Sequence, residues 1–298
     1  MSYKFKNISI VSSFVCLWLA SFLTANLELI FGFLLILSFG MLHGANDIIL
    51  FDKLSKSKGK LPYLLMLSVY ISVVLLVLFV FYWAPLFALT IFVSGSAYHF
   101  GEQHWEHESL KSTDLITYTF YFIYGLFVIA LLLILNTSQV IAIVESIIKD
   151  QFPVVAIDYL FYTVSISFVI LTTYLAIIDV DFRRRIWQEL LYLLVFAVIF
   201  KVSSLIWGFA IYFIFWHSLP SLYDQIKFMY NGFDNYKMLA YFKKALPYWL
   251  ISILGLIGIY FMFKDMTIFN GLFFSFLAAV TLPHSFLISR MFKQVKKK

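Results

Sequence analysis

Residues 62–83 read PYLLMLSVYISVVLLVLFVFYW, a stretch without a single charged side chain. An α-helix that crosses a bilayer needs about 20 mostly apolar residues, so this stretch by itself predicts a transmembrane helix. The whole chain has the same character, because 62% of its 298 residues are hydrophobic, only 13% are charged, and its mean hydropathy is +0.92. Soluble domains carry about a quarter of charged residues. The composition therefore predicts an all-α integral membrane protein.

Further apolar segments meet the same length requirement along the chain. We predict ten transmembrane helices that form a single domain over residues 1–298, near 8–25, 28–51, 62–83, 85–105, 114–136, 155–179, 185–203, 205–226, 246–264 and 267–290. The first segment follows Lys4 and Lys6 and has some features of a signal peptide. Its length and the lack of a clear A-x-A cleavage site favour a membrane anchor. The long loop over 136–154 is expected to contain a short interfacial helix.

The basic residues test this count of helices. With ten spans, only Lys149, Lys201 and Lys264 fall on one side of the membrane, and the other 19 of the 22 Lys and Arg fall on the other side. Cytoplasmic loops carry such an excess, so both termini are predicted to be cytoplasmic in a multi-pass protein of the cell inner (plasma) membrane. The net charge of +6 therefore reflects topology, and no nucleic-acid partner is predicted. The single cysteine, Cys16, excludes an intramolecular disulfide and a thiolate metal cluster.

Four of the six histidines lie inside predicted spans, and all four of these spans run in the same direction. They fall in the cytoplasmic half of their helices, roughly 9–15 Å from the interface at 1.5 Å per residue; they are His43, His99, His217 and His284. Ionisable residues inside a membrane are costly and usually functional. If the four helices adjoin, the four imidazoles form one layer.

The other two histidines fall where the predicted helix over 85–105 reaches the cytoplasm. His107 stands among glutamates and is interpreted as part of a solvated helix end. For His104 two readings stay open, a solvated helix end or a substitute ligand. Asp47 follows His43 by four residues and Glu102 follows His99 by three, which places each carboxylate on the face of a histidine. Each is either a near-surface charge or an acceptor for the second ring N–H of a ligating histidine.

An all-nitrogen donor set favours redox-active iron or copper over magnesium or calcium. The H-E-x-x-H pattern of the commonest zinc proteases is absent from the sequence. Two other functions remain open at this point. One is a secondary or proton-coupled transporter with an intramembrane His/Asp relay, and the other is a haem-binding electron carrier.

Four short motifs around these histidines resemble one known family. They are HGANDI (43–48), SAYHFGE (96–102), FWHSLPS (215–221) and LPHSFLISRM (282–291). In this order they are similar to the Brp/Blh family of membrane β-carotene dioxygenases, over about residues 38–292. The resemblance implies a non-haem Fe(2+) held by histidines, and cleavage of the central 15,15′ double bond of β-carotene by O2 to two all-trans-retinal. It also implies a setting in which retinal passes to a microbial rhodopsin.

The candidate site follows from the histidine layer and this resemblance together. We predict that His43, His99, His217 and His284 are the metal ligands and catalytic residues, with His104 as substitute and with Asp47 and Glu102 orienting the ligands. A hydrocarbon substrate needs no charged anchor and can enter from the lipid. The predicted walls of its pocket are the aromatic residues beside the ligands, Tyr98, Phe100, Phe215 and Trp216.

Overall fold

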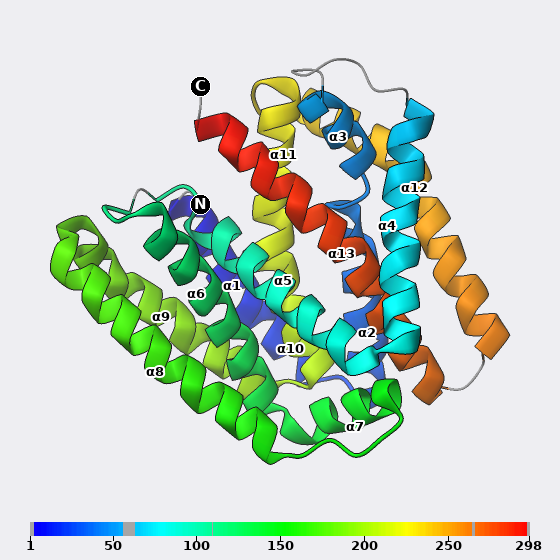
Figure 1. Cartoon of the computed structure of the whole chain (residues 1–298), viewed down its shortest axis with the longest axis horizontal. Helices are drawn as coiled ribbons and strands as arrows, with labels where there is room; N and C mark the ends of the chain where they lie inside the picture. Colours follow the sequence, from blue (N-terminus) through cyan, green and yellow to red (C-terminus); the bar gives the residue numbers. More distant parts are fainter. Residues whose placement is uncertain (1–2, 56–62, 109, 264–265, 297–298) are drawn as a thin grey trace. The chain divides into compact units, whose positions relative to one another are not determined.

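The computed structural model describes residues 3–55, 63–108, 110–263 and 266–296, and every element in these ranges is a helix (Figure 1). In chain order they are α1 (Tyr3–Ala20), α2 (Ala25–Leu35), η1 (Ile36–Gly40), α3 (Asp47–Ser55), α4 (Tyr63–Trp83), α5 (Pro85–Trp105), α6 (Asp114–Leu135), α7 (Thr137–Ile148), α8 (Val155–Ile178), α9 (Val180–Val202), α10 (Leu205–Tyr212), η2 (Phe213–Ser218), α11 (Leu219–Tyr230), α12 (Asn235–Phe263) and α13 (Met266–Lys296). The elements η1 and η2 are π-helical. The prediction of an all-α protein is confirmed.

Five helical segments among the described residues are long and apolar enough to cross a membrane. They are Leu64–Trp83, Asp114–Leu135, Val155–Ile178, Leu205–Tyr230 and Leu272–Lys296. Each coincides with one of the predicted spans, and together they indicate a membrane protein. The total of ten spans and the cytoplasmic position of the termini stay predictions. Lys264, one of the three lysines on the minority side, lies outside the described residues.

The prediction of one continuous helix over 28–51 is wrong. The chain instead forms α2 and η1, turns at residues 43–46, and starts again as α3. The turn is closed by short-range bonds, in which the Gly44 N–H donates to the Met41 carbonyl and the Asp47 N–H to the Gly44 carbonyl. The Asn46 side chain, which competes well with helical bonding, donates to the Tyr241 carbonyl at 3.1 Å. His43 therefore lies in a turn between two helical segments.

The predicted span over 205–226 is helical throughout but contains the π-helix η2. Pro220 follows two residues after it and has no N–H for the helical ladder. The Leu219 N–H donates to the Ile214 carbonyl five residues back, which is the π-helical spacing. A single π-turn beside a proline is frequent at functional sites, and this one carries His217. The loop over 136–154 contains the short helix α7, so the predicted short helix in this loop is confirmed.

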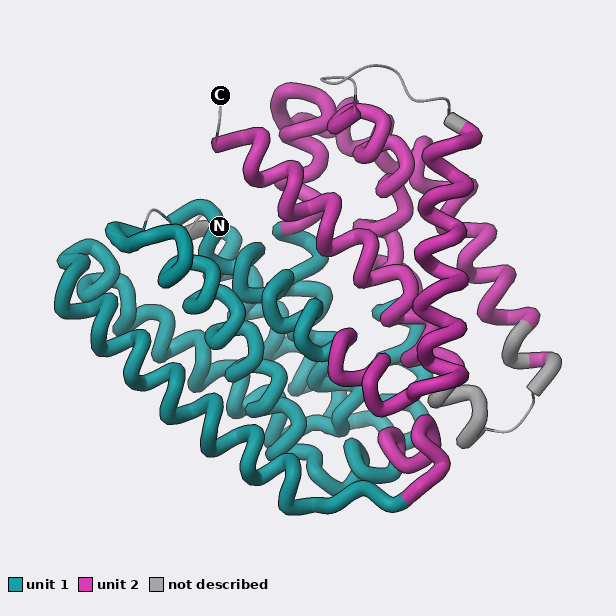
Figure 2. The backbone as a smooth tube through the Cα atoms, in the orientation of Figure 1, with its two compact units in different colours: residues 1–36, 93–142, 151–220 teal, residues 37–92, 143–150, 221–298 magenta. Residues whose placement is uncertain are grey.

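The chain divides into two compact units, each of which is assembled from separate stretches of sequence (Figure 2). Unit 1 comprises residues 1–36, 93–142 and 151–220, and unit 2 comprises residues 37–92, 143–150 and 221–298. The single domain expected from the sequence stays a prediction.

In unit 1, helices α6, α8 and α9 pack side by side around aromatic side chains (Figure 1). The Trp105 ring contacts Phe120 and Phe182 at centroid distances of 5.0 and 5.4 Å, and Phe120 and Phe182 contact each other at 5.4 Å. All three side chains are almost fully buried. Large aromatic side chains contribute much of the apolar area of a core, and these three join the end of α5 to α6 and α9.

Helices α5 and α6 approach each other backbone to backbone at two glycines. A Cβ atom on Gly101 would overlap the Tyr121 carbonyl, and a Cβ atom on Gly125 would overlap the Ala97 carbonyl. Small residues are what permit so close an approach between membrane helices. This contact fixes the part of α5 that carries His99.

We expect Gly125→Ala to destabilise the protein by about 2 kcal/mol, because the added methyl group meets backbone atoms that have no rotamer to change. The thermal midpoint of the detergent-solubilised protein should fall by roughly 4–8 °C. Gly255→Ala on α12 is the matched control, because nothing lies within 4 Å of its added Cβ. An equal fall in both variants would contradict the close contact of α5 with α6.

In unit 2, α13 packs against α4 and α3 (Figure 1). The contact with α3 is apolar and consists of Leu50, Leu287, Ile288, Met291 and Phe292. A second apolar cluster joins Phe81 of α4 to Ala88 and to Ala278 of α13. These contacts hold α13, which carries His284, beside the segment that carries His43.

Candidate metal centre

The first histidine pair lies in unit 1. His99 of α5 and His217 of η2 are both almost fully buried, and their ring centroids are 4.6 Å apart with the rings nearly perpendicular. A transition metal lies about 2 Å from a histidine nitrogen. Two rings at this spacing therefore fit two ligands of one ion.

Aromatic rings surround this pair. The Phe100 ring lies 4.5 Å from the His217 ring, and Phe213 stacks on His217 at 5.5 Å with an angle of 14° between the rings. Both phenylalanines are buried. Such surroundings limit the rotation of the His217 imidazole and so fix the direction of its ring nitrogens.

The second histidine pair lies in unit 2. His43, in the turn before α3, and His284 of α13 have ring centroids 4.7 Å apart at an interplanar angle of 88°. Both side chains are buried, and a ring nitrogen of one lies within 4.8 Å of a ring nitrogen of the other. The second pair thus repeats the geometry of the first.

Asp47 orients a histidine of the second pair, and this histidine is His284. The Asp47 Oδ1 atom lies 2.7 Å from His284 Nδ1, and Asp47 Oδ2 accepts a hydrogen bond from the Tyr70 hydroxyl at 3.1 Å. A carboxylate in this position favours the tautomer with the proton on Nδ1 and leaves Nε2 for a metal. The sequence predicts that Asp47 lies on the same helix face as His43. The chain is not helical at residues 43–46, so Asp47 contacts His284 instead.

Tyr241 of α12 supports the turn that carries His43. Its hydroxyl lies 3.2 Å from the His43 carbonyl and 2.8 Å from Gln225 Oε1, and its own carbonyl accepts the bond from Asn46. Tyr241, Gln225 and Asn46 are fully buried. This network satisfies backbone and side-chain polar groups where the helix is interrupted, as a membrane protein requires.

The residues predicted to flank the ligands have different surroundings. Glu102 is buried, and its Oε1 atom accepts a hydrogen bond from the Tyr98 hydroxyl at 2.9 Å. Among the predicted pocket walls, Phe100 contacts the His217 ring. The Trp216 ring packs against Tyr192 and Phe196 of α9, at 5.4 and 4.7 Å. The Phe215 carbonyl accepts a hydrogen bond from Ser9 of α1 at 2.8 Å.

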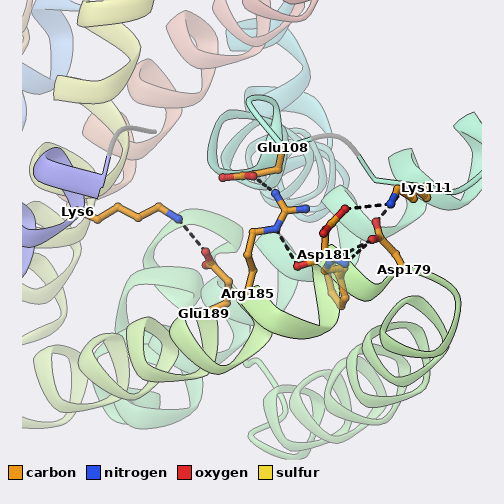
Figure 3. A network of polar contacts seen from close by, with 8 residues as sticks. Lys6, Glu108, Lys111, Asp179, Asp181, Arg185 and Glu189 are labelled. Carbon is orange, nitrogen blue, oxygen red and sulfur yellow. Dashed lines mark hydrogen bonds and ion pairs between the residues drawn. The ribbon is translucent and has the colours of Figure 1, made fainter.

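The reading of His104 as a solvated helix end is wrong, because its side chain is buried. His104 Nε2 lies 2.6 Å from Glu189 Oε2, and the Tyr124 hydroxyl lies 3.1 Å from the same nitrogen. The other Glu189 oxygen accepts from the Lys6 ammonium at 2.7 Å (Figure 3). Sequence spacing alone does not reveal this cluster, because its members come from four helices. His107, in contrast, is exposed as predicted.

A separate set of charges joins the end of α5 to the start of α9 (Figure 3). Arg185 forms an ion pair with Glu108, and the Lys111 ammonium donates to Asp181 at 2.9 Å. The hydrogen bond and the negative charge of Asp181 raise the pKa of Lys111 above its ordinary value. The Lys111 N–H also donates to Asp179, whose other oxygen caps the first turn of α9. These contacts place α9, and with it Glu189, beside α5.

Comparison with known proteins identifies the family of this chain. The fold and the site are those of a helical membrane protein with two buried pairs of histidines. The family model of β-carotene 15,15′-dioxygenase matches residues 34–292, so the chain belongs to this family. It is accordingly an enzyme of the carotenoid-cleaving dioxygenase class, and carotenoid and O2 are its implied substrates. No curated protein and no solved structure matches the chain. All four histidines of the pairs lie in the matched region, whereas α1 precedes it.

Proposed function

We propose that this protein cleaves the central 15,15′ double bond of β-carotene with O2 to give two molecules of all-trans-retinal. The family match over residues 34–292 is the observation that carries the proposal. The reaction balances with one O2 per β-carotene, because the C=C bond is broken and each of its carbons becomes an aldehyde carbon. Family membership favours this enzyme over the transporter and the haem carrier that the sequence left open.

The proposed cofactor is a single Fe(2+) with His43, His99, His217 and His284 as ligands. The donor set agrees with this choice, since neutral imidazoles are good ligands for iron and both pairs are shielded from water. When bound, the iron supplies the redox chemistry that activates O2. The protein contributes the positions of the imidazoles, the tautomer of His284 through Asp47, and a dry apolar surrounding.

The proposed substrate is consistent with the residues around the first pair. β-Carotene is a hydrocarbon, so recognition rests on shape and apolar contact, and Phe100 beside His217 is the best-placed wall among the aromatic residues. Tyr98, Phe215 and Trp216 are proposed to line the pocket further out. Glu102 is proposed to act on this pair through the Tyr98 hydroxyl, with which it shares a hydrogen bond. The position of the cut would then follow from the length of the pocket on either side of the iron.

The bilayer is the proposed source of the substrate. We assign the protein to the cell inner (plasma) membrane as a multi-pass protein with ten spans and both termini in the cytoplasm. β-Carotene dissolves in the apolar part of a membrane and can reach a buried site without crossing water. A microbial rhodopsin is the proposed acceptor of the retinal.

Expression in bacteria that accumulate β-carotene tests the proposal. We expect the orange colour to fade and retinal to appear in the extract, with two retinals formed for each carotene lost. Purified protein should contain one iron per chain. Unchanged carotene, in cells with verified membrane expression and added iron, would rule out the proposed activity.

Asp47→Ala is expected to weaken metal binding by about 10- to 100-fold, because His284 loses the carboxylate that fixes its tautomer. Tyr70→Phe should have a smaller effect, since Asp47 keeps its bond to His284. Titration of the detergent-solubilised apoprotein with Co2+, followed by visible absorption, measures both changes. The proposed role of Asp47 fails if Asp47→Ala binds Co2+ as tightly as the unchanged protein.

A further inference from the structure

The N-terminal helix α1 contacts the π-helix η2 through buried polar side chains. Ser9 and Ser13 lie on one face of α1 and are buried, as is Lys6. Their neighbours Ile8, Val11 and Phe14 are exposed. Trp216 Nε1 donates a hydrogen bond to Ser13 Oγ at 3.0 Å, and Ser13 donates to the Ser9 carbonyl at 2.7 Å. The buried serines of α1 therefore face η2, the element that carries His217.

The bond from Ser9 satisfies a carbonyl that the π-helix leaves without its usual donors. In an α-helix the Phe215 carbonyl would accept from the Leu219 N–H, but that N–H donates to Ile214. In a π-helix it would accept from residue 220, which is a proline without an N–H. The Ser9 hydroxyl lies 2.8 Å from this carbonyl, and 3.0 Å from the Phe5 carbonyl of its own helix. A buried carbonyl needs such a partner in a membrane protein.

The placement of α1 has a second support in the buried ion pair between Lys6 and Glu189, whose nitrogen–oxygen distance is 2.7 Å (Figure 3). The Lys6 ammonium also lies 4.9 Å from the centre of the Tyr192 ring, and Tyr192 in turn contacts Trp216. Three side chains of α1 at the spacing of one helix face, Lys6, Ser9 and Ser13, therefore hold the helix against α9 and η2. None of them lies in the region that the family model matches.

We propose that α1 is a positioning element of the metal centre, in which Ser9 and Ser13 hold η2 in the geometry that presents His217 to the metal. Ser9 does so at the Phe215 carbonyl, and Ser13 does so through the Trp216 indole, the two residues directly before His217. The proposal rests on the proposed function, because it takes His217 as a ligand. Neither serine is a catalytic residue, since each acts through the backbone or side chain of η2.

The experiment measures the affinity of the detergent-solubilised apoprotein for Co2+ in the unchanged protein and in four variants. Ser9→Ala is expected to raise the Co2+ dissociation constant about tenfold, as the loss of an outer support of a ligand does. Ser9→Thr keeps the hydroxyl and should bind as the unchanged protein does. Pro220→Ala restores an N–H at residue 220, so adding Ser9→Ala to Pro220→Ala should change the dissociation constant by less than about threefold.

The control is Ser12→Ala, which removes a hydroxyl from a partly buried position on the same helix and should leave Co2+ binding unchanged. If Ser9→Ala lowers the thermal midpoint without changing Co2+ affinity, α1 is only a stabilising element and the inference is overturned. The inference is also overturned if Ser9→Ala lowers the Co2+ affinity equally in the presence and absence of Pro220→Ala. Should Ser9→Ala fail to fold, Ser9→Cys replaces it, and an affinity equal to that of the unchanged protein counts against the inference. An unchanged protein that binds no Co2+ instead contradicts the proposed function.

Discussion

Cleavage of β-carotene should fall by more than about 100-fold when His217 or His284 is replaced by alanine. Each substitution removes a proposed metal ligand from one of the two pairs. Loss of a ligand should lower activity at least as much as loss of a residue that orients a ligand. The measurement is retinal formed per unit of membrane protein in carotene-accumulating cells. His43→Ala and His99→Ala are expected to give the same result, because each removes the partner ring of its pair.

His107→Ala is the matched control for these variants. Its imidazole is exposed, so the substitution should leave both expression and cleavage unchanged. His104→Ala separates a ligand from a residue of the core. It should lower stability through the loss of contacts with Glu189 and Tyr124, while the folded fraction keeps its iron.

The iron content of the same variants tests whether the two pairs serve one ion. If four histidines share a single iron, His217→Ala and His284→Ala should both lose most of the metal. If each pair held its own ion, each variant would keep the metal of the other pair. Full activity of His284→Ala would exclude His284 as a ligand.

The main features of the fold follow from properties that the sequence shows directly. The apolar stretches 62–83 and 155–179 are long enough, as helices, to cross the hydrocarbon core of a bilayer. The described structure has helices at both places. The matched direction of their predicted spans places His43, His99, His217 and His284 at a similar depth in the membrane. The short motifs around them resemble one family, and the family match over residues 34–292 confirms this prediction.

Interruptions of helices were not predictable in the same way. The apolar residues before His43 predict a helix that continues past it. The turn that interrupts this helix is held by Asn46 and Tyr241, which are far apart in sequence and meet only in the folded chain. The π-helix at His217 likewise depends on a donor from α1. Periodicity reports which side of a helix is apolar, but it does not report which polar groups in other helices replace a missing backbone bond.

The pairing of charges between distant helices is also not predictable from the sequence. From the sequence, Lys6 is one basic residue of the N-terminal side, and Glu189 is a carboxylate inside a predicted span. In the structure they meet at 2.7 Å with side chains less than a tenth exposed. A lone carboxylate in an apolar helix indicates that a partner exists, and this signal was available for Glu189. The identity of the partner was not, because Lys6 precedes it by most of the chain.

Glu189→Leu is expected to destabilise the protein by about 3–5 kcal/mol, which would make it one of the most damaging single substitutions outside the histidines. The carboxylate accepts from both Lys6 and His104, so its removal leaves a buried ammonium without a counter-charge. Most of this cost is the desolvation of Lys6 and not the loss of attraction as such. The thermal midpoint of the solubilised protein, or its resistance to unfolding in a denaturing detergent, measures the change.

The double variant Lys6→Met with Glu189→Leu shows whether this reason is correct. It removes both charges and keeps the apolar volume, so it should recover a large part of the stability that Glu189→Leu loses. In this variant Tyr124 remains a hydrogen-bond partner of His104. If the double variant were as unstable as the sum of the two single variants, the pair would not be coupled. In that case, the ion pair would not be what holds α1 in place. Recovery of stability in the double variant would establish the pair of Lys6 and Glu189 as a stabilising contact between α1 and α9.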